Sequence, residues 1–237
     1  TSSVIIVLAF AAVYLIWGST YLAIRYAIET LPPFLMAATR FLIAGTILFC
    51  WATINGESVR QSISQWRRAL VIGGLLLLCG NGGVTWAEKH ISSGLAALLV
   101  ATEPLWVVVL NWAVTHKRPS AKVLLGVLLG LIGVAFLVSN GLSGGPANPT
   151  MSLIGTAVVI VSGFAWASGS VYANRRPITA STAMASGMQM LTGGLLLLLL
   201  SASTGDFQRL NVSQVSMVSI GAVSYLIVFG SIVAFTA

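Results

Sequence analysis

Two ionisable side chains lie inside long apolar stretches of this sequence and are its sharpest candidates for chemistry. Arg40 lies in the stretch that begins at Pro33, and Glu103 lies in the stretch that begins at Ile91. A charge at the centre of a bilayer costs roughly 2.5 to 3.5 kcal/mol on insertion scales, so each group needs a partner, a water-filled cavity or a ligand. Arg40 would bind an anionic group, or it would tie helices together through backbone carbonyls. Glu103 would carry a proton, or it would form a salt bridge or a hydrogen bond across helices.

The two groups can also be considered together. At about 1.5 Å per helical residue they differ in depth by roughly 8 Å, which extended side chains on tilted helices can span. One expectation is therefore an ion pair between Arg40 and Glu103. The other is a division of roles, in which Arg40 holds an anionic substrate group and Glu103 carries a proton. Pro104 follows Glu103 and removes the backbone bond to the carbonyl of Val100, so we expect a kink there.

Aromatic and amide side chains lie at related depths. The candidates are Trp17, Tyr21, Asn81, Trp166 and Gln189. Counting helical rise puts Trp17, Arg40 and Asn81 roughly 10 Å from one membrane surface, and Trp166 and Gln189 about 10 Å from the other. We expect these two layers to line a cavity, because polar groups in hydrocarbon face the bundle interior or water. For Trp17 and Tyr21, contact with planar or cationic substrate groups competes almost equally with plain helix packing.

Other kinds of chemistry have little support in the sequence. Cys50 and Cys79 both fall inside apolar runs, and His90 and His116 lie beside basic residues, so neither a disulfide nor a metal site is indicated. We expect no cofactor. The sequence has no Walker A motif, and it has no paired acids, HExxH or Ser/His constellation at one depth, so neither an ATP-driven pump in this chain nor a membrane enzyme is indicated.

The elements that carry these residues are apolar helices. Only 17 of the 237 residues are charged, whereas a soluble domain of this length would carry roughly 59. A bilayer span needs about 20 apolar residues. Apolar runs and breakers predict eight spans, at 4–24, 33–54, 68–87, 91–114, 122–139, 152–172, 180–201 and 215–237. The prediction is an all-α integral membrane protein in a lipid bilayer, with its Lys and Arg in small groups and no basic stripe for nucleic acid.

The basic residues predict an orientation. The loops after the second, fourth and sixth spans carry eight Lys and Arg, whereas those after the first, third, fifth and seventh carry three. Positive loops stay in the cytoplasm, so the N-terminus is expected inside. In the fifth span, Gly126 and Gly130 form a GxxxG pattern that predicts close packing within a monomer or, as the minority interpretation, a homodimer.

The two halves of the chain resemble each other at an offset near 150 residues. GSTY at 18–21 matches GSVY at 169–172, and Arg40, Leu42 and Gly45 align with Gln189, Leu191 and Gly194. The prediction is a first repeat at 1–139, a linker at 140–151 and an incomplete second repeat at 152–237. Five spans in the first repeat place the second in inverted topology. By this logic the intact protein has ten spans, of which this chain holds eight.

With these motifs the chain resembles the EamA-like permeases of the drug/metabolite transporter superfamily. The resemblance rests on IWGSTYLAIR at 16–25, PPFLMAATRF at 32–41, the segment from Gly80 to Trp106, and GVLLGLIGV at 126–134. It implies a multi-pass carrier of the bacterial inner membrane. Its partner would be a small-molecule substrate such as an amino acid, exported by alternating access between the repeats, with proton coupling as one option. The alternatives are a multidrug exporter of the same fold, or a non-transporting membrane fragment or scaffold.

Overall fold

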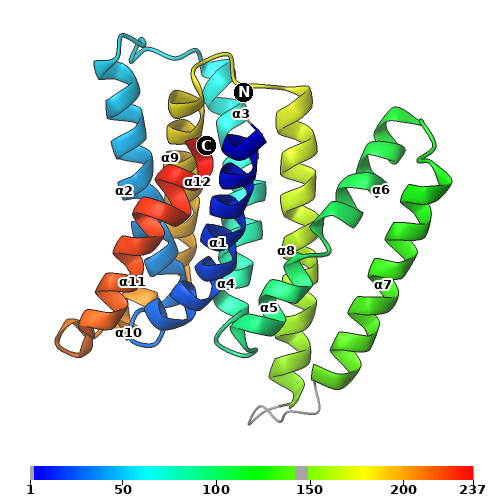
Figure 1. Ribbon diagram of the computed structural model, residues 1–237. Coiled ribbons are helices and arrows are strands. Elements are labelled where there is room, and N and C mark those ends of the chain that lie inside the picture. The colour runs from blue at the N-terminus through cyan, green and yellow to red at the C-terminus, as the bar shows by residue number, and fades with distance from the viewer. Residues whose placement is uncertain (1–2, 142–148, 237) are drawn as a thin grey trace.

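The computed structural model describes residues 3–141 and 149–236, and the regular structure within them is helical throughout (Figure 1). Stretches η1 and η4 are π-helical, and η3 is a short 3₁₀ turn. The elements are α1 Ser3–Ala27, α2 Pro33–Ile54, α3 Ile63–Gly73, η1 Gly74–Gly82, α4 Gly83–Ala87, α5 Ser93–Val100, α6 Glu103–Thr115, α7 Ala121–Gly141, α8 Pro149–Arg175, α9 Thr182–Ser203, α10 Asp206–Arg209, η3 Val212–Gln214, α11 Met217–Ile227, η4 Val228–Val233 and α12 Ala234–Thr236.

The elements group into eight long segments, as the apolar pattern predicts. Within the described residues, six segments are long and apolar enough to cross a bilayer: Pro33–Ile54, Ile63–Ala87, Ser93–Thr115, Pro149–Arg175, Thr182–Ser203 and Met217–Thr236. The two other expected spans, 4–24 and 122–139, coincide with α1 and α7, which have 25 and 21 residues. The prediction of an all-α, multi-pass membrane protein is confirmed.

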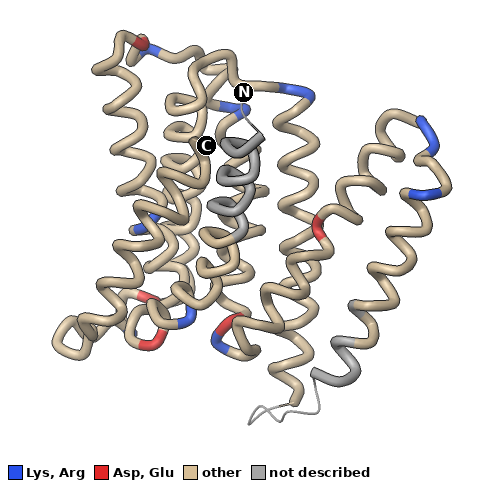
Figure 2. The backbone as a smooth tube through the Cα atoms, viewed as in Figure 1, with Lys and Arg blue, Asp and Glu red and all other residues tan. Residues whose placement is uncertain are grey.

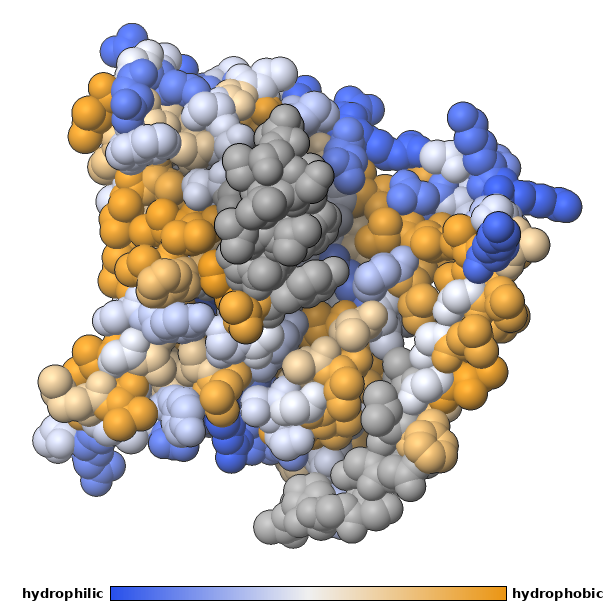
Figure 3. Space-filling view, in the orientation of Figure 1, coloured by the Kyte–Doolittle hydropathy of each residue, from blue (hydrophilic) through white to orange (hydrophobic). Residues whose placement is uncertain are grey.

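Successive segments run in opposite directions (Figure 1). The N-terminus shares one end of the molecule with the α2–α3, α6–α7 and α8–α9 connections, which carry the richer set of basic residues. Lys and Arg lie near both ends (Figure 2). On the face seen in Figure 3, hydrophobic side chains predominate at mid-height on either side of the residues drawn in grey, and hydrophilic ones gather at the ends, as in a protein surrounded by hydrocarbon.

Helices α2 and α9 pack closely against each other, with glycines at their contact. A Cβ on Gly45 would lie 2.9 Å from the backbone nitrogen of Leu191, and one on Gly194 would lie 2.9 Å from the side chain of Leu42. These two contacts are reciprocal, because the sequence alignment pairs Leu42 with Leu191 and Gly45 with Gly194. Such exchange of equivalent contacts is what a two-fold relation between two halves produces.

Two loops at opposite ends of the bundle form a second pair of similar contacts, because an acid in each loop accepts hydrogen bonds from the start of another helix. Among the described residues, the glycines with a positive φ are Gly56 and Gly205, and each is followed by an acid. Glu57 accepts a 2.8 Å hydrogen bond from the backbone N–H of Ser181, at the start of α9. Asp206 accepts bonds of 3.0 and 3.2 Å from the first turn of α2, which has no side-chain cap of its own. Each loop therefore supplies a carboxylate that satisfies free N–H groups at the start of a helix distant in sequence, α9 for Glu57 and α2 for Asp206.

Three segments depart from regular α-helix. The third and eighth segments contain η1 and η4, which correspond closely at the offset near 150 residues. The fourth segment breaks at Ala101 and Thr102, so that α6 starts at Glu103 with Pro104 in its first turn. The expected kink is confirmed, and its cause is the proline that cannot continue the backbone bonds of α5.

Helix α7 lies beside α6 at the edge of the molecule and packs loosely (Figure 1). Of the GxxxG pair, only Gly130 approaches a neighbour, with its Cβ position 3.2 Å from Leu105, whereas Gly126 faces open space. The expectation of a close-packed face within the monomer is therefore wrong for Gly126. The reason is that α6 and α7 lean away from the bundle instead of crossing it at the glycines.

Candidate functional site

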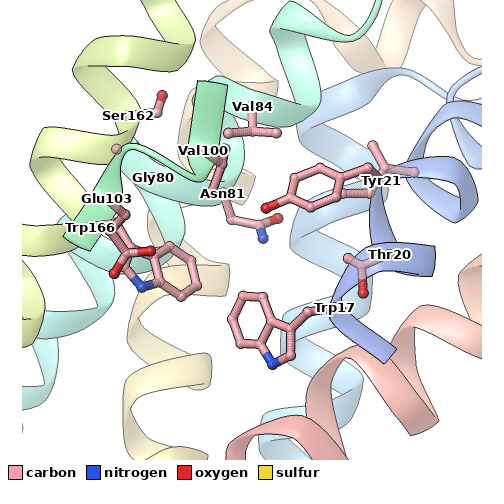
Figure 4. Close-up of a pocket in the computed structure, with 12 residues that line it drawn as sticks. Trp17, Thr20, Tyr21, Gly80, Asn81, Val84, Val100, Glu103, Ser162 and Trp166 are labelled. Atoms are coloured by element: carbon pink, nitrogen blue, oxygen red, sulfur yellow. The ribbon is translucent and has the colours of Figure 1, made fainter. Parts of the chain in front are cut away.

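A small pocket lies between α1, the η1–α4 segment, the α5–α6 break and α8 (Figure 4). Five of the seven candidate residues line it: Trp17, Tyr21, Asn81, Glu103 and Trp166. Tyr21 and Trp17 project from α1 towards Asn81 and towards the wall that carries Glu103 and Trp166. The structure thus gathers most of the candidate site from four separate segments.

The two tryptophans form one wall together. Their ring centroids lie 5.6 Å apart in an edge-to-face arrangement, with Phe235 of α12 at 6.4 Å from each. This differs from the expectation of two separate layers. Because α1 and α8 are longer than the expected spans, Trp17 and Trp166 lie ten and nine residues from their helix ends, which is about 14 to 15 Å at the helical rise and close to mid-depth for both.

Glu103 reaches the pocket because the fourth segment breaks. It is the first residue of α6, and its side chain is partly buried. The N–H of Ala101 still donates to the carbonyl of Ala97, as in a continuous helix, but the N–H of Thr102 donates to Leu99 and that of Leu105 to Thr102, each one residue nearer than in an α-helix. The break brings a carboxyl to the pocket wall next to Val100, and a carboxyl there can accept or give up a proton.

The other polar groups come from the faces of α1 and η1. Residues 17, 20, 21 and 24 of α1 share one helical face and all line the pocket. Asn81 presents its amide from η1, where Thr85 donates a 2.8 Å bond to its backbone carbonyl. Trp17, Tyr21, Asn81 and Glu103 together offer aromatic faces, a hydroxyl, an amide and a carboxyl, a set that can bind a small polar or cationic solute.

Arg40 lies outside the pocket and has other partners. Its Nε donates a 2.8 Å bond to the hydroxyl of Ser231, and one terminal nitrogen donates a 2.7 Å bond to the carbonyl of Gly230. The guanidinium also lies 4.7 Å above the ring of Phe41, and its other terminal nitrogen has no partner among the described residues. Arg40 thus braces α2 against η4. The ion pair with Glu103 is not seen in the described part of the chain, where the salt bridge is Arg209 with Asp206.

Gln189 also lies outside the pocket. Its backbone carbonyl faces α3, 2.5 Å from the Cβ position of Gly73, at the close contact between α3 and α9. The structure therefore places Arg40 and Gln189 in the central packing of the bundle and the other five candidates around the pocket.

Sequence reasoning missed several pocket residues: Thr20, Gly80, Ser162 and Gly163. Helical spacing could have found two of them, since Thr20 lies three residues after Trp17 and Ser162 lies four residues before Trp166. Gly80 was not identifiable, because its role is to let Trp166 approach: the Cβ position lies 2.9 Å from the indole.

The pocket is small in this conformation. Its volume is about 30 Å³, which suffices for a water molecule or two and falls far short of the roughly 300 Å³ of an ordinary ligand pocket. A solute of several atoms could enter only if the surrounding helices moved apart.

The comparisons with known proteins agree with one another. The EamA-like transporter family matches residues 4–139. An uncharacterised inner membrane transporter of Escherichia coli K12, YedA, is 38% identical over 231 residues, which cover 97% of this chain and 71% of that protein. A WAT1-related chloroplastic protein of Arabidopsis thaliana is 25% identical over 94% of this chain and 54% of its own length.

A solved structure supports the same fold. The chain aligns over its whole length with 78% of a protein of known crystal structure, with a TM-score of 0.68 and 25% identity. The Escherichia coli relative is named as an inner membrane transporter, and both relatives are longer than this chain.

Proposed function

Because the chain belongs to the EamA-like transporter family, we propose that it is a secondary transporter that carries small metabolites such as amino acids through the pocket beside Trp17 and Trp166. The observation that carries this proposal is the pocket itself. Aromatic, amide and carboxyl groups from four segments converge on it near mid-depth, and intramembrane polar groups of this kind mark solute pathways.

Alternating access is the mechanism that fits the architecture. The reciprocal contacts of α2 with α9, and of Glu57 and Asp206 with the opposite halves, support a pair of inverted repeats with the boundaries 1–139 and 152–237. Repeats of opposite topology can rock about a central site and expose it to each side in turn. The pocket is too small for a solute in this conformation, so the site must widen during such a cycle.

Each pocket residue has a proposed role. Trp17, Tyr21 and Trp166 hold the apolar or cationic part of the solute between aromatic faces. Asn81 forms hydrogen bonds with its polar part. Glu103 pairs with a cationic group or carries a proton, and Arg40 and Gln189 hold the helices that must move.

The orientation follows from the loop charges. We place the N-terminus in the cytoplasm of a bacterial inner membrane, so that the ends of α1 and α4 face outward. We propose export as the direction of transport.

Uptake by proteoliposomes tests the proposal. The intact protein would be screened with radiolabelled amino acids, nucleosides and organic cations, in the presence and absence of a pH gradient. We expect accumulation of one class, with Trp166→Ala and Asn81→Ala reducing it roughly tenfold or more, as expected when binding contacts are lost. A matched control is Trp112→Ala, since Trp112 is exposed on α6, away from the pocket.

A multidrug exporter of the same fold is the second candidate. It would accept several unrelated lipophilic cations in that screen, and Glu103→Gln would abolish their transport while sparing neutral solutes. Transport of no compound by the intact protein would contradict both candidates.

A further inference from the structure

Glu88 is a buried acid that the pocket does not account for. It follows the span Ile63–Ala87 directly, its side chain is 0% exposed, and both carboxyl oxygens lack a hydrogen-bond partner among the described residues. Buried polar groups in native proteins nearly always have partners, so such a group is expected to have a function. An unpaired carboxylate is also costly to bury, which favours the neutral, protonated acid.

The groups around Glu88 leave its carboxyl without a strong counter-charge. Arg25 of α1 is the cation that acts on it, but the Arg25 guanidinium donates its hydrogen bond to the backbone carbonyl of Glu88. Lys89 is exposed and interacts with Asp206 and Arg209, and the ring of His90 stacks against Trp86 at 4.7 Å. Helix α5 and residues 149–174 of α8 contain no charged or histidine side chain. Arg40 of α2 is bound to η4.

Glu88 is therefore set to titrate in the physiological range. Burial raises the pKa of its carboxyl to about 8, against the smaller opposing effect of Arg25. The acid can hold a proton at neutral pH and release it when the surroundings open to water or when Arg25 moves closer.

Glu88 is also connected to the pocket. Tyr21 lies one helical turn before Arg25 on α1, and it packs against the buried cluster that includes Ala87 and Ile91, on either side of Glu88 in the chain. Tyr21 and Glu103 line the pocket. Tyr21 lies six residues, or about 9 Å, from the end of α1, and Glu103 lies ten residues, or about 15 Å, from the start of α5. The three side chains thus occupy successive depths from the end of the bundle to the pocket.

We propose that Glu88 is the proton-binding site of this transporter and that Tyr21 relays the proton between Glu88 and Glu103, an inference that rests on the proposed transport function. No hydrogen bond joins Tyr21 to Glu88 in this conformation, so the relay operates when helix movement brings the Tyr21 hydroxyl within hydrogen-bond distance of both carboxyls. The Glu88 carboxylic acid then gives its proton to the Tyr21 oxygen while the Tyr21 O–H gives its proton to the Glu103 carboxylate. Tyr21 ends unchanged, and one proton has moved from Glu88 to Glu103. A proton from the side on which α4 ends then restores the acid at Glu88.

The first test needs no substrate. Infrared spectra of the intact protein in lipid would follow the carboxyl C=O stretch as the pH is raised from about 6 to 10, across the pKa of Glu88. We expect a protonated carboxyl band that disappears around pH 8 and that is missing in Glu88→Gln. Glu29→Gln is the matched control, because Glu29 is an exposed acid at the same end of the molecule, and it should keep the band. The same band in Glu88→Gln would overturn the proposal.

The second test uses the solute found in the proteoliposome screen. Glu88→Gln should lose accumulation driven by a pH gradient by roughly tenfold or more while keeping exchange of labelled for unlabelled solute, since only the coupling is removed. Glu88→Asp should restore part of the accumulation, and Tyr21→Phe should lose it. Gradient-driven accumulation at the wild-type level in Glu88→Gln would overturn the proposal. If the wild type transports nothing, the transport function fails, and the infrared titration still decides whether Glu88 binds a proton.

Discussion

At the scale of single residues, the structure separates the two intramembrane charges into different roles. Glu103 faces the pocket, whereas Arg40 is buried with its bonds directed to Ser231 and Gly230. Both residues were identifiable from the sequence, since a charge inside an apolar run needs an explanation. The partner of Arg40 was not identifiable from the sequence, because Gly230 accepts the bond through its backbone carbonyl, which every residue type has. The sequence identifies an ionisable side chain in an apolar segment, but the packing of the helices determines which groups form hydrogen bonds with it.

The role of Arg40 can be tested through stability. Arg40→Gln removes two charge-assisted bonds and should lower the free energy of unfolding by about 3 kcal/mol or more, whereas Ser231→Ala removes only the partner of the buried Nε of Arg40 and should cost about 1 to 3 kcal/mol. Thermal unfolding in detergent measures both. Solute affinity should be unchanged in the folded fraction of either variant. A stable Arg40→Gln protein with lost affinity would instead assign Arg40 to substrate binding.

Glu88 gives a second prediction, for the dependence of stability on pH. The pKa of the buried carboxyl is about 8, above its ordinary value of 4.5. Between these values the folded protein binds more protons than the unfolded chain, so stability should fall as the pH rises from about 5 to 8. Each unit of pKa corresponds to at most about 1.4 kcal/mol. Melting temperatures of Glu88→Gln should fall less steeply over this range, and equal slopes in the two proteins would contradict the assignment.

At the scale of elements, the apolar pattern was sufficient for the number, order and approximate bounds of the segments. The apolar pattern did not predict the irregular backbone of some segments or the packing of α7, because neither depends on hydrophobic composition alone. The π-helical stretches η1 and η4 have ordinary apolar sequences, and the leaning of α6 and α7 leaves Gly126 open despite its GxxxG pattern. Pro104 is the exception, because a proline has a fixed consequence for the helix that contains it. The pocket depended on these irregular elements, which is why only part of its lining was predicted.

The two loop acids allow an element-scale prediction with its own internal control. Asp206 is 1% exposed and satisfies two N–H groups at the start of α2, whereas Glu57 is partly exposed and satisfies one at Ser181. Replacing a carboxylate that caps a helix costs typically about 1 kcal/mol and up to about 2. Asp206→Ala should therefore destabilise the protein more than Glu57→Ala in the same thermal unfolding assay. A larger loss of stability in Glu57→Ala would show that burial and the number of hydrogen bonds do not determine how much each carboxylate contributes to stability.

At the scale of the whole molecule, the alternating segments and the loop charges together predict an orientation that can be measured. The end that carries the α2–α3, α6–α7 and α8–α9 loops has eight Lys and Arg, and the other end has three. Positively charged loops resist translocation, so the first end should face the cytoplasm. This choice also decides from which side Glu88 exchanges its proton, because Glu88 lies at the end where α4 stops.

Cysteine accessibility provides that measurement. After Cys50 and Cys79 are replaced, single cysteines would be placed at Ser62 and Ser120, which are exposed at the end rich in Lys and Arg, and at Ser213, which is exposed near η3 at the other end. In intact cells an impermeant thiol reagent should label the cysteine at Ser213 and spare the other two, and permeabilised cells should show labelling of all three. Labelling of the first two positions alone in intact cells would reverse the orientation. In that case Glu88 would exchange protons with the cytoplasm, and a pH gradient of the opposite sign would be required to drive accumulation.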